Sequence, residues 1–232
     1  MTPDGVTERD GGEFVQSLER GLAVLRAFDA DHPKMTVADV AKATSLTRAT
    51  ARRLLHTLVA LGYAGTDGKL FELTPRVLDL GHAYVSSLQL PDIVQPYMED
   101  LSAQVHESVS ASVLDGLEIV YVARVPTQRI MAISLSIGSR LPAMWTSMGR
   151  VMLGDRSDEE IRTSFELTAR PPTDRAVADV DTVLREIRTA HAQGWCMVDQ
   201  ELEEGIRSVA VPLHDRQGRS IAAINVGTHA TR

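Results

Sequence analysis

The feature that most constrains the fold of this 232-residue chain is an amphipathic helical pattern over residues 48–61. Thr47 precedes the pattern, and a threonine hydroxyl at that position can accept the free amide hydrogens of a first turn. Gly62 follows it and supplies a stop, because glycine readily takes the left-handed conformation that ends helices. The apolar residues recur on one side at helical spacing: Ala51, Leu54, Leu55, Leu58 and Leu61. The segment therefore predicts a helix with one buried face and one exposed face.

Three shorter patterns surround this helix. Apolar residues at helical spacing predict a helix over residues 17–28. Thr36 followed by Asp39 is a weak capping box that starts a short helix at Val37. Residues 63–73 contain a turn signal between two short extended runs and predict a hairpin. Helix, short helix, turn, longer helix and hairpin is the order of a winged helix-turn-helix domain.

The distribution of charge within this domain points to nucleic acid. The whole chain has a formal net charge of −7, which alone argues against such a partner. Residues 40–66, however, contain no Asp or Glu and carry four basic side chains: Lys42, Arg48, Arg52 and Arg53. The last two lie opposite the leucine stripe, where a planar guanidinium can donate two hydrogen bonds to guanine or to phosphate.

Double-stranded operator DNA is therefore the expected partner of this domain. The alternative is a three-helix unit that packs on another domain and turns its arginines to water. The residues expected at the DNA are Thr36, Thr47, Arg48, Ala49, Thr50, Arg52, Arg53 and Lys69.

The rest of the chain predicts a linker helix and an α+β domain with one antiparallel sheet. A proline at a first helical turn, in Thr74-Pro75, starts the linker. Further helices are expected over residues 93–105, 146–154, 157–165 and 180–193. Strands are expected over residues 108–114, 118–125, 130–137, 195–198, 207–213 and 220–226. The expected domains are a flexible leader over residues 1–12, the winged helix over 13–73, the linker over 74–90 and a binding domain over 91–232.

Several functional classes find no support in the sequence. No run of about 18 apolar residues exists, so no membrane span is expected, and without an apolar signal region near the start the chain is expected in the cytoplasm. The lone Cys196 and seven scattered histidines predict no metal site and no cofactor. Motifs for a nucleophile elbow, a P-loop or a dinucleotide fold are missing. An acidic cluster is interpreted as a solvated turn in preference to an acid/base set: Asp199, Glu201, Glu203 and Glu204. An enzyme is the weaker hypothesis.

A ligand pocket is better supported in the second domain. The amides that open a helix at Thr146 would suit a carboxylate, and Gly149 would let that backbone approach the ligand. Ser208 and Asn225 interrupt two otherwise apolar strands, so each bonds either to a ligand or to the protein's own backbone. Four methionines fit either an adaptable cavity or an ordinary core: Met131, Met144, Met148 and Met152.

Four segments resemble, in the right order, the IclR-type transcriptional regulators: residues 17–22 with the helix-turn-helix after them, 73–81, 148–150 and 202–210. Within that family, residues 105–108, 122–127, 146–151 and 225–230 look like regulators of the β-ketoadipate and protocatechuate pathway. The resemblance implies a winged helix, a linker helix and a GAF-like domain that binds a small metabolite, usually a carboxylate. It also implies a homodimer or homotetramer that binds a pseudo-palindromic operator and does not bind a membrane.

The resemblance also implies an effector pocket. Two positions depart from the family pattern, because position 227 is commonly a small hydroxyl residue there and position 198 is often acidic. The leading hypothesis is a regulator of aromatic-acid catabolism that responds to protocatechuate or β-ketoadipate. The alternatives are a regulator that responds to another small carboxylate and an enzyme that processes one. The implied pocket residues are Ala143, Met144, Met148, Gly149, Val198, Ile206, Ser208, Asn225 and Gly227.

Overall fold

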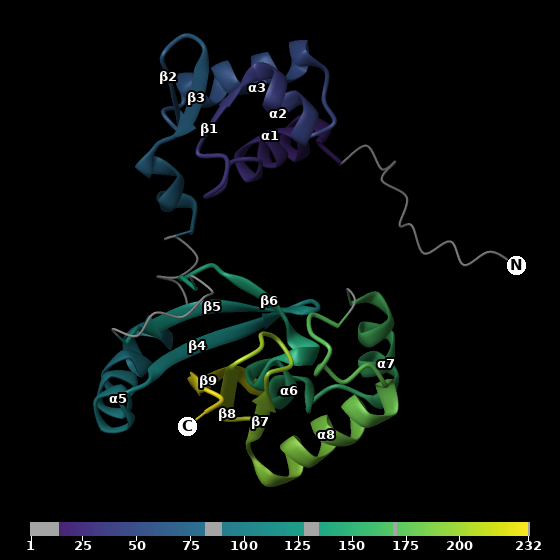
Figure 1. Ribbon diagram of the computed structural model, residues 1–232. Helices are drawn as coiled ribbons and strands as arrows, with labels where there is room; N and C mark the ends of the chain where they lie inside the picture. The colour runs from purple at the N-terminus through teal and green to yellow at the C-terminus, as the bar shows by residue number, and fades with distance from the viewer. Residues whose placement is uncertain (1–13, 82–89, 128–134, 169–170, 232) are drawn as a thin grey trace, which may run out of the picture. The chain divides into compact units, whose positions relative to one another are not determined.

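The computed structural model describes residues 14–81, 90–127, 135–168 and 171–231. The chain divides into two compact units, Met1–Tyr84 and Val85–Arg232 (Figure 1). The expected leader lies outside the described residues. Within the described ranges, no helix combines the length and the apolarity that a membrane crossing requires.

The N-terminal unit is a winged helix-turn-helix, as predicted. Its elements are α1 (Gln16–Arg26), β1 (Lys34–Thr36), α2 (Val37–Ala43), α3 (Arg48–Ala60), β2 (Ala64–Thr66) and β3 (Leu70–Leu73). The strands form an antiparallel sheet in the order β1-β3-β2. The sequence pattern missed β1, because three residues are too few to show an alternation and their pairing depends on β3. Val24, Val40, Leu55 and Phe71 belong to one buried core that holds the three helices on the sheet.

Local hydrogen bonds explain where these helices begin. The Thr36 hydroxyl accepts the Asp39 amide at 3.3 Å while the Asp39 carboxylate accepts the Thr36 amide at 2.9 Å, which completes the capping box. The Thr47 hydroxyl accepts the Thr50 amide at 3.2 Å and caps α3. Gly62, with φ of 81°, follows the end of α3.

The predicted linker is described only in part. Residues Pro75–Val77 form a 3₁₀ turn, η1, and residues 78–81 are helical. The remainder of the expected helix, residues 82–89, lies outside the described residues.

The C-terminal unit confirms the predicted α+β class. Six strands form one sheet in the order β6-β5-β4-β9-β8-β7, and all neighbours are antiparallel. The strands are β4 (Ser108–Asp115), β5 (Glu118–Val125), β6 (Arg140–Pro142), β7 (Cys196–Asp199), β8 (Ile206–His214) and β9 (Ser220–His229). The helices are α5 (Leu90–Val105), α6 (Ser147–Leu153), α7 (Asp158–Leu167) and α8 (Val180–Gln193), with a 3₁₀ turn η2 (Ala143–Trp145) before α6.

One predicted strand, over residues 130–137, can be compared with the structure only at its end. Of residues 130–137, the first five lie outside the described residues and the last three lie in a loop and turn. Gly138, with φ of 88°, turns the chain and donates its amide hydrogen to the Tyr121 carbonyl at 2.8 Å, and β6 follows from Arg140. The turn is closed by the Ser139 amide, which donates to the Ser136 carbonyl at 3.0 Å. The described end of the predicted strand is therefore a turn that leads into β6.

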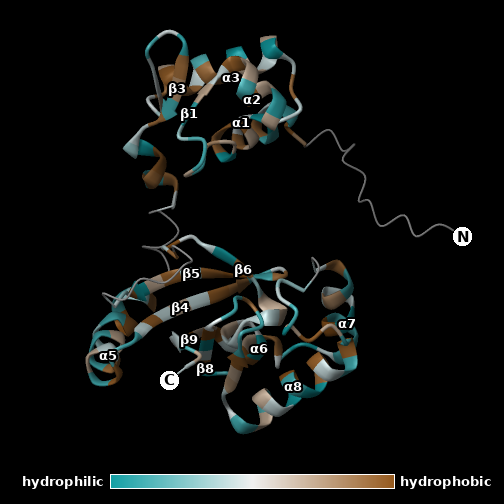
Figure 2. Cartoon of the chain, in the orientation of Figure 1, coloured by the Kyte–Doolittle hydropathy of each residue, from teal (hydrophilic) through white to brown (hydrophobic). Residues whose placement is uncertain are grey.

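Helices cover both faces of the sheet, and this arrangement positions the binding site. On one face, α5 packs on β4 and β5 through a core that includes Met98, Val109 and Val122. On the other face, α6 packs on β8 and β9, and α8 packs in turn on α6 (Figure 1). Hydrophilic and hydrophobic residues alternate along α8, whose buried side faces this second core (Figure 2).

Candidate functional site

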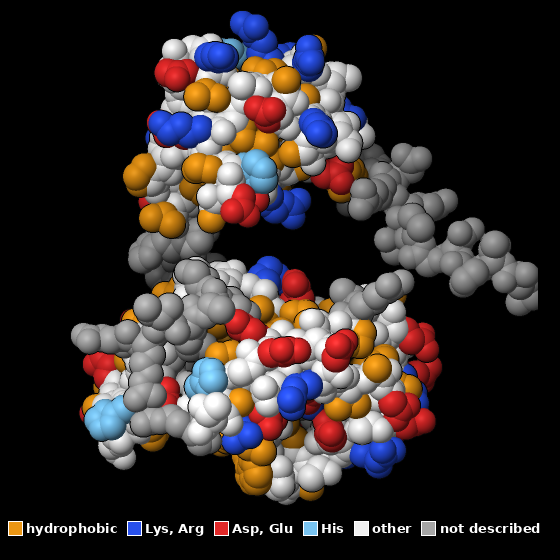
Figure 3. Space-filling model, in the orientation of Figure 1, with side chains coloured by type: hydrophobic (Ala, Val, Ile, Leu, Met, Phe, Trp, Pro, Cys, Tyr) orange, Lys and Arg blue, Asp and Glu red, His pale blue; other side chains and the backbone are white. Residues whose placement is uncertain are grey.

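The exposed face of α3 is the first candidate site. Arg48, Ala49, Arg52 and Arg53 are exposed, whereas the opposite face buries Ala51, Leu55 and Leu58. Within the described part of the N-terminal unit, the ion pairs join Lys34 to Glu72 and His32 to Asp29 and leave these arginines out. Lys and Arg side chains of this unit are prominent on the face shown in Figure 3. The face therefore offers unpaired positive charge on a helix narrow enough for the major groove of DNA.

The threonines and the lysine expected at the DNA lie in three different settings. The hydroxyls of Thr36 and Thr47 already take part in the two helix caps. Thr50 is half-buried, and its hydroxyl lies 2.9 Å from that of Thr47. Lys69 is exposed in the turn between β2 and β3, where its amide donates to Asp67 at 2.9 Å. The threonine hydroxyls thus hold the helix-turn-helix in shape, whereas the exposed arginines and the Lys69 ammonium take part in none of the ion pairs of the described part of this unit.

The second candidate site is a cavity in the C-terminal unit, between the sheet and the start of α6. A volume of about 50 Å³ is open to the centre of a water-sized sphere. Its floor is supplied by β4, β5, β7, β8 and β9, and its walls by η2, α6 and the loop between β7 and β8. It is lined by Ser108, Ser110, Tyr121, Arg124, Leu135, Trp145, Thr146, Ser147, Met148, Val198, Leu202, Glu203, Ile206, Ser208, Asn225 and Gly227.

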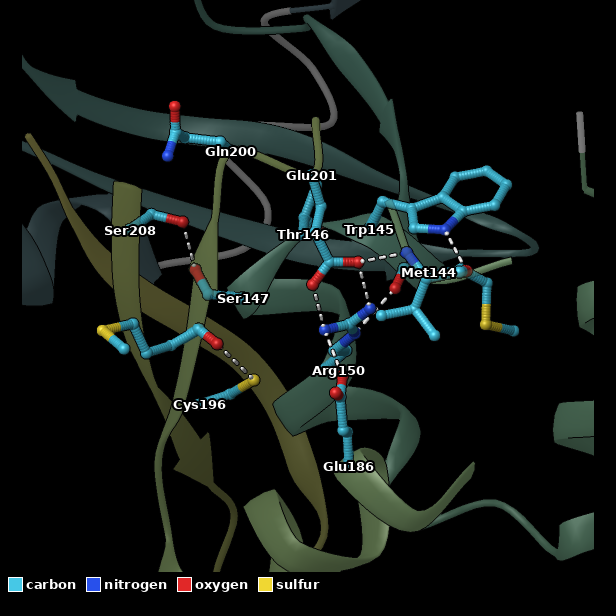
Figure 4. Close-up of polar contacts among 12 residues, drawn as sticks. Met144, Trp145, Thr146, Ser147, Arg150, Glu186, Cys196, Gln200, Glu201 and Ser208 are labelled. Carbon is cyan, nitrogen blue, oxygen red and sulfur yellow. Dashed lines mark hydrogen bonds and ion pairs between the residues drawn. The ribbon is translucent and has the colours of Figure 1, made fainter. Parts of the chain in front are cut away.

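Hydroxyl groups dominate the polar lining. The Ser147 and Ser208 hydroxyls lie 2.8 Å apart and join α6 to β8 (Figure 4). On β4, the Ser108 hydroxyl accepts the Thr127 amide at 3.2 Å. Such hydroxyls can both donate and accept hydrogen bonds, so they suit a small polar ligand.

Three ionisable side chains line the cavity: Tyr121, Arg124 and Glu203. Arg124 is half-buried, and it takes part in none of the ion pairs found among the described residues. Burial raises the pKa of Tyr121 to about 12, and the charge of Arg124 acts in the opposite direction. Tyr121 therefore stays a neutral hydrogen-bond donor near pH 7. Burial also raises the pKa of the Glu203 carboxyl above its ordinary value.

The structure brings six of the nine implied pocket residues together around this cavity: Met148, Val198, Ile206, Ser208, Asn225 and Gly227. Ala143, Met144 and Gly149 lie outside its lining. A Cβ atom on Gly149 would lie 2.1 Å from the carbonyl oxygen of Ala143. Gly149 therefore allows close packing of α6 on η2, and the expected approach of its backbone to a ligand is not what the structure shows.

Two further expectations, on the amides at the start of α6 and on the acidic turn, need correction. The Gly149 amide is not free, because it donates to the Thr146 hydroxyl at 3.0 Å. The acidic turn is not uniformly solvated: Glu201 is buried and Glu203 faces the cavity, whereas Glu204 is exposed. For the four methionines the alternatives were an adaptable cavity and an ordinary core, and three of the four lie among the described residues. Met144, Met148 and Met152 lie in the core, Met148 also lines the cavity, and Met131 lies outside the described residues.

Sequence reasoning missed the polar residues that the sheet contributes, notably Ser110, Tyr121 and Arg124. A signal was present in β4, where Ser108, Ser110 and Ser112 alternate with apolar residues and so share one face of the strand. From the sequence alone, such a row of serines indicates a face exposed to solvent. The structure shows that the strand is covered on both faces. Among the described residues, no three metal-ligating side chains come together.

A winged helix-turn-helix joined to a separate domain with a hydroxyl-lined cavity defines the class of protein, a DNA-binding regulator with a ligand-binding domain. Residues 17–68 match the IclR helix-turn-helix domain, and residues 82–232 match the C-terminal domain of bacterial IclR transcriptional regulators. The chain belongs to the IclR family.

Particular relatives agree over most of the chain. It is 46% identical over 224 residues to the Pca regulon regulatory protein of Pseudomonas putida, which covers 95% of this chain and 76% of that protein. The crystal structure of a transcriptional regulator from Rhodococcus sp. RHA1 is 52% identical, with a TM-score of 0.83 over 94% of this chain and 88% of the other. An IclR homologue from Microbacterium hydrocarbonoxydans, solved with 4-hydroxybenzoate, has a TM-score of 0.83 at 22% identity, over 93% of this chain and 90% of the other, and shows the same fold.

Proposed function

We propose that this chain regulates genes of aromatic-acid catabolism, that its α3 face binds operator DNA and that its cavity binds a small aromatic carboxylate. The observation that carries the effector assignment is Arg124, a half-buried cation outside the described ion pairs, in a cavity whose other lining is mostly hydroxyls and apolar groups, together with the Asn225 amide and the Glu203 carboxyl. The Pca regulator from Pseudomonas supports the regulatory role, and the 4-hydroxybenzoate complex from Microbacterium supports this class of ligand. The alternative is a regulator of this fold that responds to another small carboxylate.

The lining suggests how such an effector is held. The carboxylate binds Arg124 with help from the Tyr121 hydroxyl, the ring lies against Trp145 and Met148, and ring hydroxyls meet the Ser147 and Ser208 pair. This arrangement places the carboxylate at β5 and not at the start of α6. We also propose that the effector is bound and released unchanged, in the cytoplasm where operator DNA is found. Mass spectrometry that detects turnover of a bound carboxylate would favour the enzyme alternative.

Replacing Arg124 with Gln should weaken binding of 4-hydroxybenzoate or protocatechuate by about tenfold to a hundredfold, because a charge-assisted hydrogen bond contributes about 1.5 to 3 kcal/mol. Isothermal titration calorimetry measures the change. The control is Arg207→Gln on β8, where the guanidinium is already paired with Asp199 at 2.9 Å. An Arg124→Gln variant that binds both acids as tightly as the parent would place the carboxylate elsewhere.

We further propose that the protein binds DNA as a homodimer, or as a homotetramer built from such dimers. The support is an exposed apolar stripe on and before α1, where Phe14, Leu18 and Leu22 are 47%, 62% and 45% exposed. Leu18 and Leu22 are four positions apart and so share one face of α1, and Phe14 lies just before the helix. A second copy can cover this apolar stripe.

A dimer on DNA needs two half-sites with a fixed spacing. Inserting about five base pairs between the half-sites of the operator should abolish tight binding, because about half a helical turn rotates one half-site away from its recognition helix. An insertion of about ten base pairs, a whole turn, is the control and should restore part of the affinity. Gel-shift titrations compare the three operators. Footprints that show one half-site occupied at full strength would contradict the dimer.

A further inference from the structure

A buried arginine, outside the cavity lining, holds two walls of the cavity together. The Arg150 side chain on α6 is 1% exposed. Its two terminal nitrogens each lie 2.7 Å from one oxygen of the Glu201 carboxylate, and one of them also lies 2.7 Å from Glu186 on α8 (Figure 4). Its Nε donates to the Met144 carbonyl in η2 at 2.8 Å. A bidentate arginine–carboxylate pair of this kind fixes orientation as well as distance.

The contacts of Glu201 close a ring of interactions around one corner of the cavity. Its carboxylate also accepts the Val177 amide at 3.0 Å, and the Val177 carbonyl accepts the Trp145 indole N–H at 3.1 Å. Trp145 lines the cavity and is next in sequence to Met144, whose carbonyl Arg150 binds. One guanidinium and one carboxylate thus hold η2, α6 and the 200–205 loop in register.

That loop needs such support, because its backbone is strained. Gln200 is not glycine, yet it has φ of 63°. Its amide donates to the Ile206 carbonyl at 2.8 Å, and the Thr173 hydroxyl donates to the Gln200 and Glu201 carbonyls at 2.9 Å. The two residues after Glu201, namely Leu202 and Glu203, line the cavity. The Glu201 carboxylate is therefore the side-chain anchor immediately before the residues that face a ligand.

We propose that Glu201, acting through Arg150, is a positioning residue for effector recognition, which fixes the loop carrying Leu202 and Glu203 relative to Ser147 and Trp145 across the cavity. This inference rests on the proposed function in its choice of ligand. Glu186 binds the same guanidinium from α8, with its side chain 41% exposed and outside the cavity lining. Glu201 and Glu186 thus bind the same guanidinium, but only Glu201 is expected to affect the cavity. Replacing each in turn gives a matched pair of variants.

The experiment uses the full chain with Trp195→Phe, so that Trp145 remains as the single tryptophan of the two in the sequence. Three variants are compared in it: Glu201→Gln, Glu186→Gln and Ile161→Val. Ile161→Val removes one methyl group from a buried core residue outside the cavity lining. It is the control for a loss of stability that leaves the 200–205 loop unchanged. Affinities for 4-hydroxybenzoate and protocatechuate come from calorimetry, and acrylamide quenching of Trp145 is measured without ligand.

Glu201→Gln should weaken both affinities by at least about tenfold, the lower end of the loss seen when a residue that supports a metal ligand is removed, because the side chains that face the ligand lose the group that fixes their geometry. It should also raise the quenching of Trp145. Glu186→Gln and Ile161→Val should leave both properties close to those of the parent. If Glu201→Gln does not fold, Glu201→Asp, which keeps the charge but not the reach, replaces it with the same expectation.

The two proposals fail in different ways. A parent that binds neither acid overturns the proposed effector class, and the quenching comparison still tests Glu201. A parent that binds the acids, together with a Glu201→Gln variant of equal affinity and equal quenching, overturns the positioning role. An Ile161→Val variant that loses as much affinity as Glu201→Gln also overturns it, because the effect would then follow stability alone.

Discussion

Replacing Gly149 with Ala should destabilise the C-terminal unit by about 3 kcal/mol or more, an overpacking effect at the upper end of what one added methyl group causes. The new Cβ would lie 2.1 Å from the Ala143 carbonyl oxygen and 2.4 Å from its Cα atom, both of them backbone atoms. All seven residues of α6 are buried, so the helix cannot move away without disturbing the core on its other sides. Urea unfolding followed by far-ultraviolet circular dichroism measures the loss.

The matched control is Gly227→Ala on β9. A Cβ there meets no atom within 4 Å, and the residue lines the cavity. We therefore expect a stability close to that of the parent and a lower affinity for the effector, because the methyl group takes up cavity space. The two glycines thus separate packing from binding. A Gly149→Ala variant with the parent's urea midpoint would show that η2 and α6 are not in the contact described here.

Local patterns in the sequence were sufficient for the helices of the N-terminal unit. The caps at Thr36 and Thr47 and the stop at Gly62 act within a few residues of the helix ends they define, so spacing alone reveals them. The same holds for α8, which begins at the Asp179 cap and ends at Gly194 in the left-handed conformation. Such elements are set by interactions whose partners are neighbours in sequence.

The cavity depends on partners that are distant in sequence, and there the patterns were insufficient. Arg150 and Glu201 are 51 residues apart, and an acidic turn offers no local sign that one of its carboxylates will be buried. In the sequence, Arg124 is one charged residue near the end of a strand, and nothing local indicates that it lines a cavity. Gly149 is the instructive case, because a glycine permits close approach by a ligand or by the protein's own backbone. Only the position of Ala143 decides between the two.

Replacing both Arg52 and Arg53 with Ala should weaken operator binding strongly, because each arginine contributes about 1 to 3 kcal/mol if it makes a bidentate base contact. Both side chains are exposed and outside the described ion pairs, so their removal should change the free energy of unfolding by less than about 0.5 kcal/mol. Gel-shift titration and thermal melts of the single and double variants separate these two effects.

Salt dependence then tells base contacts from phosphate contacts at these two positions. An arginine that neutralises a phosphate releases counterions, so its loss lowers the slope of log affinity against log salt by about one. An arginine that reads guanine should instead relax sequence preference at one position of the half-site. Lys42→Ala is the control, since Lys42 is an exposed cation of the same acid-free segment but lies on α2. If Lys42→Ala costs as much affinity as Arg52→Ala and Arg53→Ala, binding depends on the charge of the domain and not on which face of α3 meets the DNA.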